Sequence, residues 1–385
     1  MKRAMCIIGV ALLVWAGCEK APQKPGAGAG EPPVMLTVGH VGHDHQLALY
    51  VAALEGERFL TEWGIGLKEV KAREVYDLVE DGKARARLRL LKVGGGSRMP
   101  AAMSRGEIEI GLGGTVPVAK FADGGQPIRI ICPLQTDGDM LVMQADSPIA
   151  DWPAFVAAAK AAGKPVRIGY KAPVAVAKLV FEGALKAEGI PYGLDASDPN
   201  TRVVLVNFGS EKSPIPLMEI KAIDGFVMNQ PGVAVAVDKG LGKVIAELRD
   251  LPPKGKWLDH PCCCIAATAE TLTKHPGPVK ALLKVILLST QLIRQDQKLA
   301  IADAARWTKY SEAVERSSIP TIAYVAEPTD RWLAGMETWA EMVANVKLFK
   351  GKYAAMAPKE FVADVCDLAL CRAAADELRK KGALK

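Results

Sequence analysis

Aromatic side chains and runs of basic residues are both scarce in this chain of 385 residues. Phe, Trp and Tyr together make up 6% of it, which disfavours a binding site built to stack a large aromatic ligand. Five consecutive Lys or Arg residues never occur and the formal net charge is +6, so nothing resembles an arm that binds nucleic acid. A Gly-x-x-x-x-Gly-Lys-Ser/Thr phosphate loop is also missing, which excludes a P-loop ATPase.

The composition that is present belongs to a globular protein. Hydrophobic residues make up 50% of the chain and charged residues 24%. A single hydrophobic core stops growing at about 250–300 residues, so a longer chain divides into lobes or domains. We therefore expect a body with two lobes.

The first 33 residues have the pattern of an export signal followed by a tether. A short positive segment precedes an apolar stretch that ends in small residues before Cys18. The stretch Leu13–Cys18 resembles a bacterial lipobox, in which the cysteine carries lipid after cleavage, although Trp15 stands where leucine is usual. The Pro-, Gly- and Ala-rich residues that follow are typical of a flexible linker. We expect an export signal at 1–17, lipidation of Cys18, a tether over 18–33, and an extracytoplasmic, membrane-anchored body.

From residue 34 onward, short apolar runs alternate with stretches of helical spacing. Strands are expected at, among others, Met35–Val41 and Arg87–Val93, with helices between them such as Leu47–Phe59. Strands separated by helices indicate βαβ units, so the predicted fold class is α/β with parallel-rich sheets. After about Glu270 helical spacing dominates, and the periodicity of Pro278–Arg294 predicts a core helix within a C-terminal helical segment.

Four predicted turns at the carboxyl ends of strands carry unusual chemistry. In parallel sheets ligands collect at such ends, where the N–H groups of the following helix point outward. The Lys171 turn has no Ser, Thr, Asp or Asn immediately before its helix, which leaves N–H groups available to an anion. Each turn could instead be an ordinary structural turn. The candidate ligand-binding residues are His43, Asp44, His45, Gln46, Gly114, Thr115, Lys171, Ala172, Pro173, Asn229 and Gln230.

The order of these segments resembles a known family. The opening "TVGHVGHDHQLALYVAALEGERF" is followed by "GIGLKEV" and then by "MPAAMSRGEIEIGLGGTVPVAKFADGGQPIRII". This series resembles the periplasmic solute-binding proteins of the nitrate/sulfonate/taurine/thiamine-precursor class of ABC importers. The resemblance covers about residues 34–300.

The resemblance implies a two-lobed periplasmic-binding-protein fold of type II, whose lobes close around one small solute. Lobe 1 would comprise 34–133 plus 262–385, lobe 2 would comprise 137–258, and the crossovers would lie at 134–136 and 259–261. The implied function is capture of a small anion or heterocycle and its delivery to a membrane permease with a separate ATPase. The resemblance implies neither catalysis, nor a metal or cofactor, nor a nucleic-acid partner, and we expect a monomer.

Three of the five histidines lie within six residues, at His40, His43 and His45. Neutral imidazoles ligate transition metals, whereas a protonated imidazole holds an anion. The residues of this turn could therefore touch the solute, serve the turn structurally, or bind metal. A metal-binding lipoprotein that uses His43, Asp44 and His45 is one alternative function.

Cys262, Cys263 and Cys264 follow one another directly. They resemble the cysteine-rich motif of the eukaryotic-type thiamine pyrimidine synthase, an enzyme of the same fold that consumes its own histidine together with pyridoxal phosphate. The motif is incomplete here, because Ile265 follows the triplet. Buried packing, a disulfide with Cys132 or another partner, and a metal or reactive-thiol site all stay open. An enzyme of this kind, or a lyase, is the second alternative function.

Overall fold

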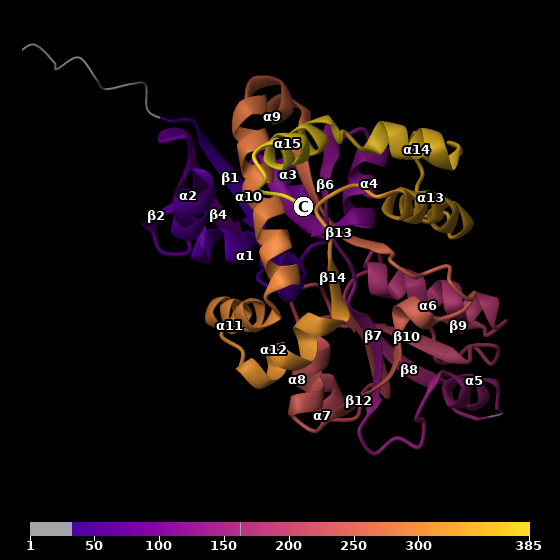
Figure 1. Cartoon of the computed structure of the whole chain (residues 1–385). Helices are drawn as coiled ribbons and strands as arrows, with labels where there is room; N and C mark the ends of the chain where they lie inside the picture. Colours follow the sequence, from indigo (N-terminus) through magenta and orange to yellow (C-terminus); the bar gives the residue numbers. More distant parts are fainter. Residues whose placement is uncertain (1–32, 162) are drawn as a thin grey trace, which may run out of the picture. The chain divides into compact units, whose positions relative to one another are not determined.

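The computed structural model describes residues 33–161 and 163–385 (Figure 1). The predicted export signal at 1–17, the lipidation of Cys18 and nearly all of the tether at 18–33 lie outside the described residues and stay predictions. The described body combines helices with two β-sheets, so the predicted α/β class is confirmed.

The larger sheet forms the core of lobe 1 and combines strands from distant parts of the chain. Its strands are β1 (Met35–His40), β2 (Ile65–Lys71), β3 (Val75–Glu80), β4 (Lys83–Lys92), β5 (Ile110–Gly114), β6 (Ile128–Asp137), β13 (Pro261–Thr268) and β14 (Ile322–Tyr324). They lie in the order β14-β6-β13-β5-β1-β4-β3-β2. The helices against it are α1 (Leu47–Leu54), α2 (Gly56–Trp63), α3 (Met99–Ser104), α4 (Thr115–Asp123), α10 (Pro276–Gln295) and α15 (Ala369–Lys380).

The smaller sheet forms the core of lobe 2. Its strands are β7 (Asp139–Gln144), β8 (Val166–Tyr170), β9 (Tyr192–Gly193), β10 (Val203–Asn207), β11 (Gly225–Asn229) and β12 (Gly242–Glu247), in the order β12-β7-β11-β8-β10-β9. The helices of this lobe are α5 (Trp152–Lys160), α6 (Val176–Ala187), α7 (Ile215–Glu219) and α8 (Gly232–Asp238). Figure 1 shows this lobe below the larger sheet.

The two sheets differ in how their strands pair. In the smaller sheet β10 runs parallel to β8 and β9, and β11 runs parallel to β8. In the larger sheet β1 runs parallel to β4 and β5, whereas β2, β3 and β4 form an antiparallel meander and β13 runs antiparallel to β5 and β6. The larger sheet is therefore mixed rather than parallel-rich. The reason is that short turns without a helix join β2, β3 and β4, and such turns reverse the chain.

Helix α10 is long and apolar enough to cross a membrane by length and composition, but 72% of its apolar window is buried inside the body. Helices α1 and α15 pack against it. Its one buried charge, Lys284, lies 2.6 Å from Glu80 and also contacts Glu377. Because this charge is paired and the apolar face is covered, α10 is a core helix, as the sequence predicts.

Two passages connect the sheets, one between β6 and β7 and one just before β13. Asp137, Gly138 and Asp259 have positive φ angles of 60°, 76° and 56°. The buried imidazole of His260 lies 3.3 Å from Asp137 and 3.1 Å from Asp139. Burial alone lowers the pKa of His260, but the two carboxylates outweigh burial and raise the pKa to about 10. A buried imidazolium therefore ties the outgoing passage to the returning one.

The chain after β13 is mainly helical, as predicted. It forms α9 (Ala269–Lys274), α10, α11 (Gln297–Thr308), α12 (Glu312–Ser318), α13 (Asp330–Asn345), α14 (Pro358–Val365) and α15. Helix α11 packs on α1 of lobe 1, whereas α12 packs on α8 of lobe 2. In α13, Trp339 donates its ring N–H to the carbonyl oxygen of Pro261 at 2.9 Å. The C-terminal segment therefore contacts both lobes and the returning passage.

A buried carboxylate fixes the loop after α13. Asp123, at the end of α4, accepts hydrogen bonds from the backbone N–H groups of Lys350, Gly351 and Tyr353 at 2.9–3.1 Å. Burial raises the pKa of Asp123, but these donors outweigh burial and lower it overall. The ionised form of Asp123 thus holds the C-terminal segment against α4.

Replacing this carboxylate should destabilise the fold. We expect Asp123→Ala to lower the free energy of unfolding in urea by about 3 kcal/mol at pH 7, because several backbone donors lose their acceptor. Because the pKa of Asp123 is lowered in the folded state, its stabilising contribution is complete above the usual carboxyl pKa and is lost as pH falls from there through the lowered folded-state pKa, so the difference from wild type should shrink toward acid pH. Glu107→Ala, which removes an exposed pair with Arg105, is the control and should leave the free energy of unfolding nearly unchanged. An equal decrease in the free energy of unfolding in the two variants would contradict the role assigned to Asp123.

Candidate functional site

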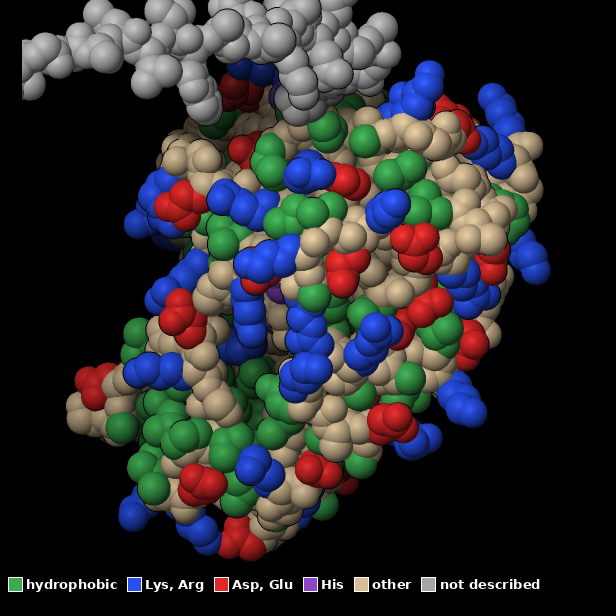
Figure 2. Space-filling view, turned by 90° about the vertical axis from the view of Figure 1, so that its left-hand side faces the viewer, with side chains coloured by type: hydrophobic (Ala, Val, Ile, Leu, Met, Phe, Trp, Pro, Cys, Tyr) green, Lys and Arg blue, Asp and Glu red, His purple; other side chains and the backbone are tan. Residues whose placement is uncertain are grey.

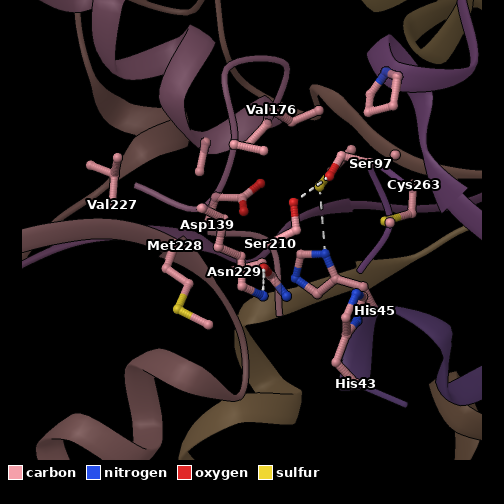
Figure 3. Close-up of a pocket in the computed structure, with 18 residues that line it drawn as sticks. His43, His45, Ser97, Asp139, Val176, Ser210, Val227, Met228, Asn229 and Cys263 are labelled. Atoms are coloured by element: carbon pink, nitrogen blue, oxygen red, sulfur yellow. Dashed lines mark hydrogen bonds between the residues drawn. The ribbon is translucent and has the colours of Figure 1, made fainter. Parts of the chain in front are cut away.

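A cavity lies between the two sheets and is drawn in Figure 3. It encloses about 590 Å³ of unfilled space, part of which is open to solvent. Lobe 1 and β13 contribute His43, His45, Gly96, Ser97, Gly114, Pro117, Cys262 and Cys263, and lobe 2 contributes Asp139, Lys171, Ala172, Ala175, Val176, Ala177, Ser210, Val227, Met228 and Asn229. Both lobes therefore build one cavity.

Strand ends explain why these residues meet. β1, β4 and β5 of lobe 1 end beside the cavity, as do β8, β10 and β11 of lobe 2, and the chain leaves each of them through a short turn. His43 and His45 belong to the turn after β1, where the 3-10 helix η1 (Asp44–Gln46) begins. Lys171 follows β8 directly, and Asn229 is the last residue of β11. The cavity thus occupies the position at which open α/β sheets collect ligands.

The two lobes touch each other at the rim of the cavity. The hydroxyl oxygens of Ser97 in lobe 1 and Ser210 in lobe 2 are 2.8 Å apart and share a hydrogen bond. Next to them Arg98 pairs with Glu211 across the gap. A Cβ on Gly94 would clash with Glu211, so the absence of a side chain there allows the close approach. The structure therefore shows the lobes closed.

Lys171 supplies a positive charge to the wall. Its ammonium nitrogen donates to the side-chain oxygen of Asn229 at 3.1 Å. Burial lowers the pKa of Lys171 to about 8, although the nearby Asp139 partly offsets this. Among the described lining residues, Lys171 alone is a lysine or arginine. It is therefore the natural partner for an anionic group in the cavity.

Two further polar groups face the same space. The Nδ1 atom of His43 is buried and has no hydrogen-bond partner among residues 33–161 and 163–385. Burial, together with His45 and Lys171, holds the pKa of His43 well below its usual value, so its ring is neutral. Asp139 is almost fully buried; burial raises its pKa, but the hydrogen bond from His260 prevails and lowers it. The cavity can thus offer a neutral imidazole and a carboxylate beside the ammonium.

Sulfur atoms form one corner of the cavity, which we call the sulfur corner and define as His45, Cys262 and Cys263. One nitrogen of His45 and the two sulfurs lie within 4.8 Å of one another, and the His45 Nδ1 to Cys262 Sγ distance is 3.5 Å. A hydrogen bond from Cys262 and then the contact with His45 outweigh burial and lower the pKa of Cys263 to about 6, whereas burial raises the pKa of Cys262. This donor set is of the type that binds zinc and related metals.

The third cysteine of the triplet behaves differently. Cys264 is fully buried, packs in the core and is not part of the cavity lining. Within the described residues every cysteine is unbridged, although the sulfurs of Cys132 and Cys371 lie 3.5 Å apart. Core packing therefore accounts for Cys264, while Cys262 and Cys263 belong to the sulfur corner.

Several of the residues predicted from the sequence lie together at the cavity. They are His43, His45, Gly114, Lys171, Ala172 and Asn229. Figure 3 shows the two histidines on one side and Asn229 opposite them. Their side chains or backbones are thus placed to contact a solute held between the lobes.

Two residues of the histidine turn point elsewhere. Asp44 is buried, accepts a hydrogen bond from the hydroxyl of Ser318, and its backbone oxygen accepts from Tyr324 at 3.0 Å. Burial and the neighbouring Glu315 raise the pKa of Asp44. Gln46 accepts from the N–H of Val41 at 2.7 Å and donates to the carbonyl of Leu112 at 2.6 Å. Both side chains fasten the turn instead of lining the cavity.

The remaining predicted residues also have structural contacts. Thr115 donates to the carbonyl of Cys262 at 3.1 Å, and Gln230 accepts from the N–H of Ala234 at 3.1 Å at the start of α8. Pro173 lines a separate hollow beside α6. The structure does not bring these three residues into the cavity.

Sequence reasoning missed Ser97, Asp139 and Ser210. The two serines follow strands β4 and β10 in turns rich in glycine, and glycine next to a polar residue after a strand was the available signal. Asp139 follows Gly138 at the passage between the lobes. Its importance depends on His260, which lies far away in the sequence, so local pattern could not show it.

An outer hollow, which Gln230 lines, adjoins the cavity and shares five residues with it: His43, Lys171, Ser210, Met228 and Asn229. It adds two lysines, Lys92 and Lys212, together with the acidic Glu211. Figure 2 shows that Lys and Arg side chains border a hollow on one face of the molecule. Because such a mouth attracts negative charge, an anion could be guided toward Lys171.

Solved structures share this fold. The ligand-binding component of an ABC-type import system from Staphylococcus aureus, with zinc bound, is 17% identical, with a TM-score of 0.68 over 89% of this chain and 99% of that one. The periplasmic nitrate-binding protein NrtA from Synechocystis PCC 6803 is 16% identical, with a TM-score of 0.66 over 92% and 91%. The alkanesulfonate-binding protein SsuA from Xanthomonas axonopodis pv. citri, bound to MOPS, is 14% identical, with a TM-score of 0.63 over 88% and 100%. The predicted two-lobed periplasmic-binding-protein fold is thereby confirmed.

Sequence comparison places the chain in a family. An uncharacterized protein of Methanocaldococcus jannaschii, MJ1180, is 30% identical over 148 residues, which make up 37% of this chain and 97% of that protein. Residues 31–309 match the NMT1-like family, a span that includes the smaller sheet, all strands of the larger sheet except β14, and every residue of the cavity. This chain therefore belongs to the NMT1-like family.

Proposed function

We propose that this protein is the extracytoplasmic solute-binding component of an ABC importer. It would capture a small anion or heterocycle between its lobes and deliver it to a permease that works with a separate ATPase. The observation that carries the proposal is the cavity lined by both lobes, whose rim is bridged by the Ser97–Ser210 hydrogen bond. The fold and the family support it, since the nitrate- and alkanesulfonate-binding proteins named above have the same architecture.

The walls of the cavity define the chemistry of the solute. Much of the surface contributed by lobe 2 is apolar, through Ala172, Ala175, Val176, Val227 and Met228. The ammonium of Lys171 and the amide of Asn229 stand beside that surface. A small organic solute with an anionic end and an apolar or heterocyclic body satisfies both parts.

Catalysis on the same fold is the competing function. A pyrimidine-synthase-like enzyme or a lyase would use His45 and the cysteines of the sulfur corner, which lie within reach of any molecule in the cavity. A binding protein releases the compound unchanged, whereas an enzyme converts it into a product. Turnover of a candidate compound that is lost in His45→Ala would favour the enzyme; recovery of the compound unchanged favours the binding protein.

Lys171 should be required for binding an anionic solute. A thermal-shift screen of the purified chain against nitrate, sulfonates and pyrimidine precursors should reveal a stabilising compound, since a ligand at about 100 times its Kd adds about 2.7 kcal/mol. Lys171→Gln should then weaken binding of that compound by about 10-fold to 100-fold, the equivalent of one charge-assisted hydrogen bond. The control is Lys186→Gln, an exposed lysine of α6. Equal affinity of Lys171→Gln and wild type would exclude Lys171 as the anion partner.

The same lysine predicts a pH dependence. Because the pKa of Lys171 is about 8, its charge is present at pH 7 and mostly lost at pH 9. His43 is neutral and Asp139 ionised throughout this range, and Cys263, with a pKa of about 6, is already deprotonated at its start. The Kd for an anionic solute should therefore rise from pH 7 to pH 9 in wild type and stay flat in Lys171→Gln. Titration calorimetry at the two pH values checks this, and a flat profile in wild type would contradict it.

Export and anchoring concern residues outside the described range. If Cys18 carries lipid, cells expressing the full chain should incorporate a fatty-acid analogue into it and retain it with the membranes, as the lipobox-like stretch Leu13–Cys18 implies. Cys18→Ala should lose both properties. Cys6→Ala, inside the predicted export signal, is the matched control and should keep them. Labelling of Cys18→Ala at the wild-type level would rule out this anchor.

A further inference from the structure

The sulfur corner depends on an irregularity in β13. In a regular strand, neighbouring side chains point to opposite faces, so Cys262 and Cys263 would be separated. Here the pairing of β13 with β6 shifts register between Pro261 and Cys263, and again between Cys263 and Cys264. Both sulfurs consequently lie at the cavity beside His45, which belongs to η1 after β1.

The imidazole of His45 is oriented toward the sulfurs. Its Nε2 atom lies 3.3 Å from the carbonyl oxygen of Gly138, a hydrogen-bond acceptor, so Nε2 carries the proton. The lone pair is therefore on Nδ1, the atom that lies 3.5 Å from Cys262 Sγ. A backbone carbonyl that fixes the far nitrogen of an imidazole is the usual partner of a metal-ligating histidine.

The distances match those of a tetrahedral zinc site. Zinc binds imidazole nitrogen at about 2.0–2.1 Å and thiolate sulfur at about 2.3 Å, which places the nitrogen and the sulfur about 3.5 Å apart. The measured separation of His45 Nδ1 and Cys262 Sγ is 3.5 Å, and all three donors lie within 4.8 Å of one another. Little rearrangement is needed to enclose an ion.

We propose that the sulfur corner binds one zinc-like divalent ion through His45 Nδ1, Cys262 Sγ and Cys263 Sγ. Three protein ligands leave the fourth tetrahedral position open, and it faces the cavity. Resting on the proposed function, we assign that position to a donor atom of the captured solute, with water there when the solute is absent. Each thiol still protonated releases its proton to solvent on binding, so two thiolates balance the charge of the ion.

The surroundings of Gln135 fit an ion at this place. Its amide lies against His45 Nδ1, and its Oε1 atom is buried without a hydrogen-bond partner in the described part of the chain. An ion on Nδ1 displaces this amide contact. The amide group is then free to turn its unpartnered oxygen toward the ion or toward a ligand water.

Zinc alone is the probe for the first test. After treatment with a chelator, the purified full chain should bind one zinc ion in competition with a chromophoric chelator. The double variant Cys262→Ser/Cys263→Ser should bind zinc at least about 100-fold more weakly. Cys366→Ser, which removes a partly buried cysteine outside the cavity, should bind as wild type does. A wild-type chain that binds no zinc, or a double variant with unchanged affinity, overturns the site.

Cobalt(II) tests the ligand set on the unmodified chain, which covers the case in which the double variant does not fold. A tetrahedral site with two thiolates should give intense visible bands and a near-ultraviolet thiolate-to-metal charge-transfer band. Zinc should displace both signals. A weak spectrum typical of six oxygen or nitrogen ligands would overturn the assignment of the sulfurs.

Solute binding separates the two proposals. The compound screen is run on the metal-free and on the zinc-loaded chain. Zinc bound at the sulfur corner with no stabilising compound would leave the metal site standing and contradict the solute-binding function. A compound that binds a chain unable to take up zinc would support the function and overturn the metal site. Tighter binding of a compound to the zinc-loaded chain is the expected result.

Discussion

The architecture depends on one buried ionic contact, the imidazolium of His260 between Asp137 and Asp139. Arg249 also pairs with Asp137, at 3.0 Å. Taking these charges out of water is costly, and removal of His260 leaves the buried carboxylate of Asp139 without this partner. Because the charges belong to both passages between the lobes, their pairing keeps the strand ends of the two sheets directed at the same space. The existence of a shared cavity follows from that arrangement.

The ionic contact at the two passages and the cavity share a residue, since Asp139 pairs with His260 and also lines the cavity. In the cavity the carboxylate of Asp139 therefore has a charge that is already stabilised. The ammonium of Lys171, in the turn after β8, lines the same cavity. At the rim the lobes are joined by a hydroxyl–hydroxyl hydrogen bond and by the exposed Arg98–Glu211 pair, each contributing about 1 kcal/mol or less. Under the proposed function, contacts this weak would leave the balance between open and closed lobes to the solute, through its greater affinity for the closed state.

How much the sequence predicted depends on how local each feature is. The α/β class, the C-terminal helices and the polar turns at His43, Lys171 and Asn229 follow from short-range periodicity and turn chemistry, and the structure shows them. The orientation of neighbours within a turn does not follow, because η1 directs His43 and His45 to the cavity and turns Asp44 and Gln46 into structural contacts. The strand expected at Arg87–Val93 is present as β4, but its antiparallel pairing with β3, and that of β3 with β2, was not expected, because the predicted pattern placed helices between successive strands.

The cysteine triplet shows the same limit most clearly. Strand alternation predicts Cys262 and Cys264 on one face and Cys263 on the other, yet the register shifts against β6 bring Cys262 and Cys263 together and leave Cys264 in the core. A bulge arises from the pairing of two strands, so a single strand's residues cannot reveal it. Its result is a polarised cavity, with sulfur and imidazole donors on the lobe 1 side and an ammonium on the lobe 2 side. Under the proposed function, a solute bound between them would have a fixed direction, with its anionic end at Lys171 and any soft donor atom at the sulfur corner.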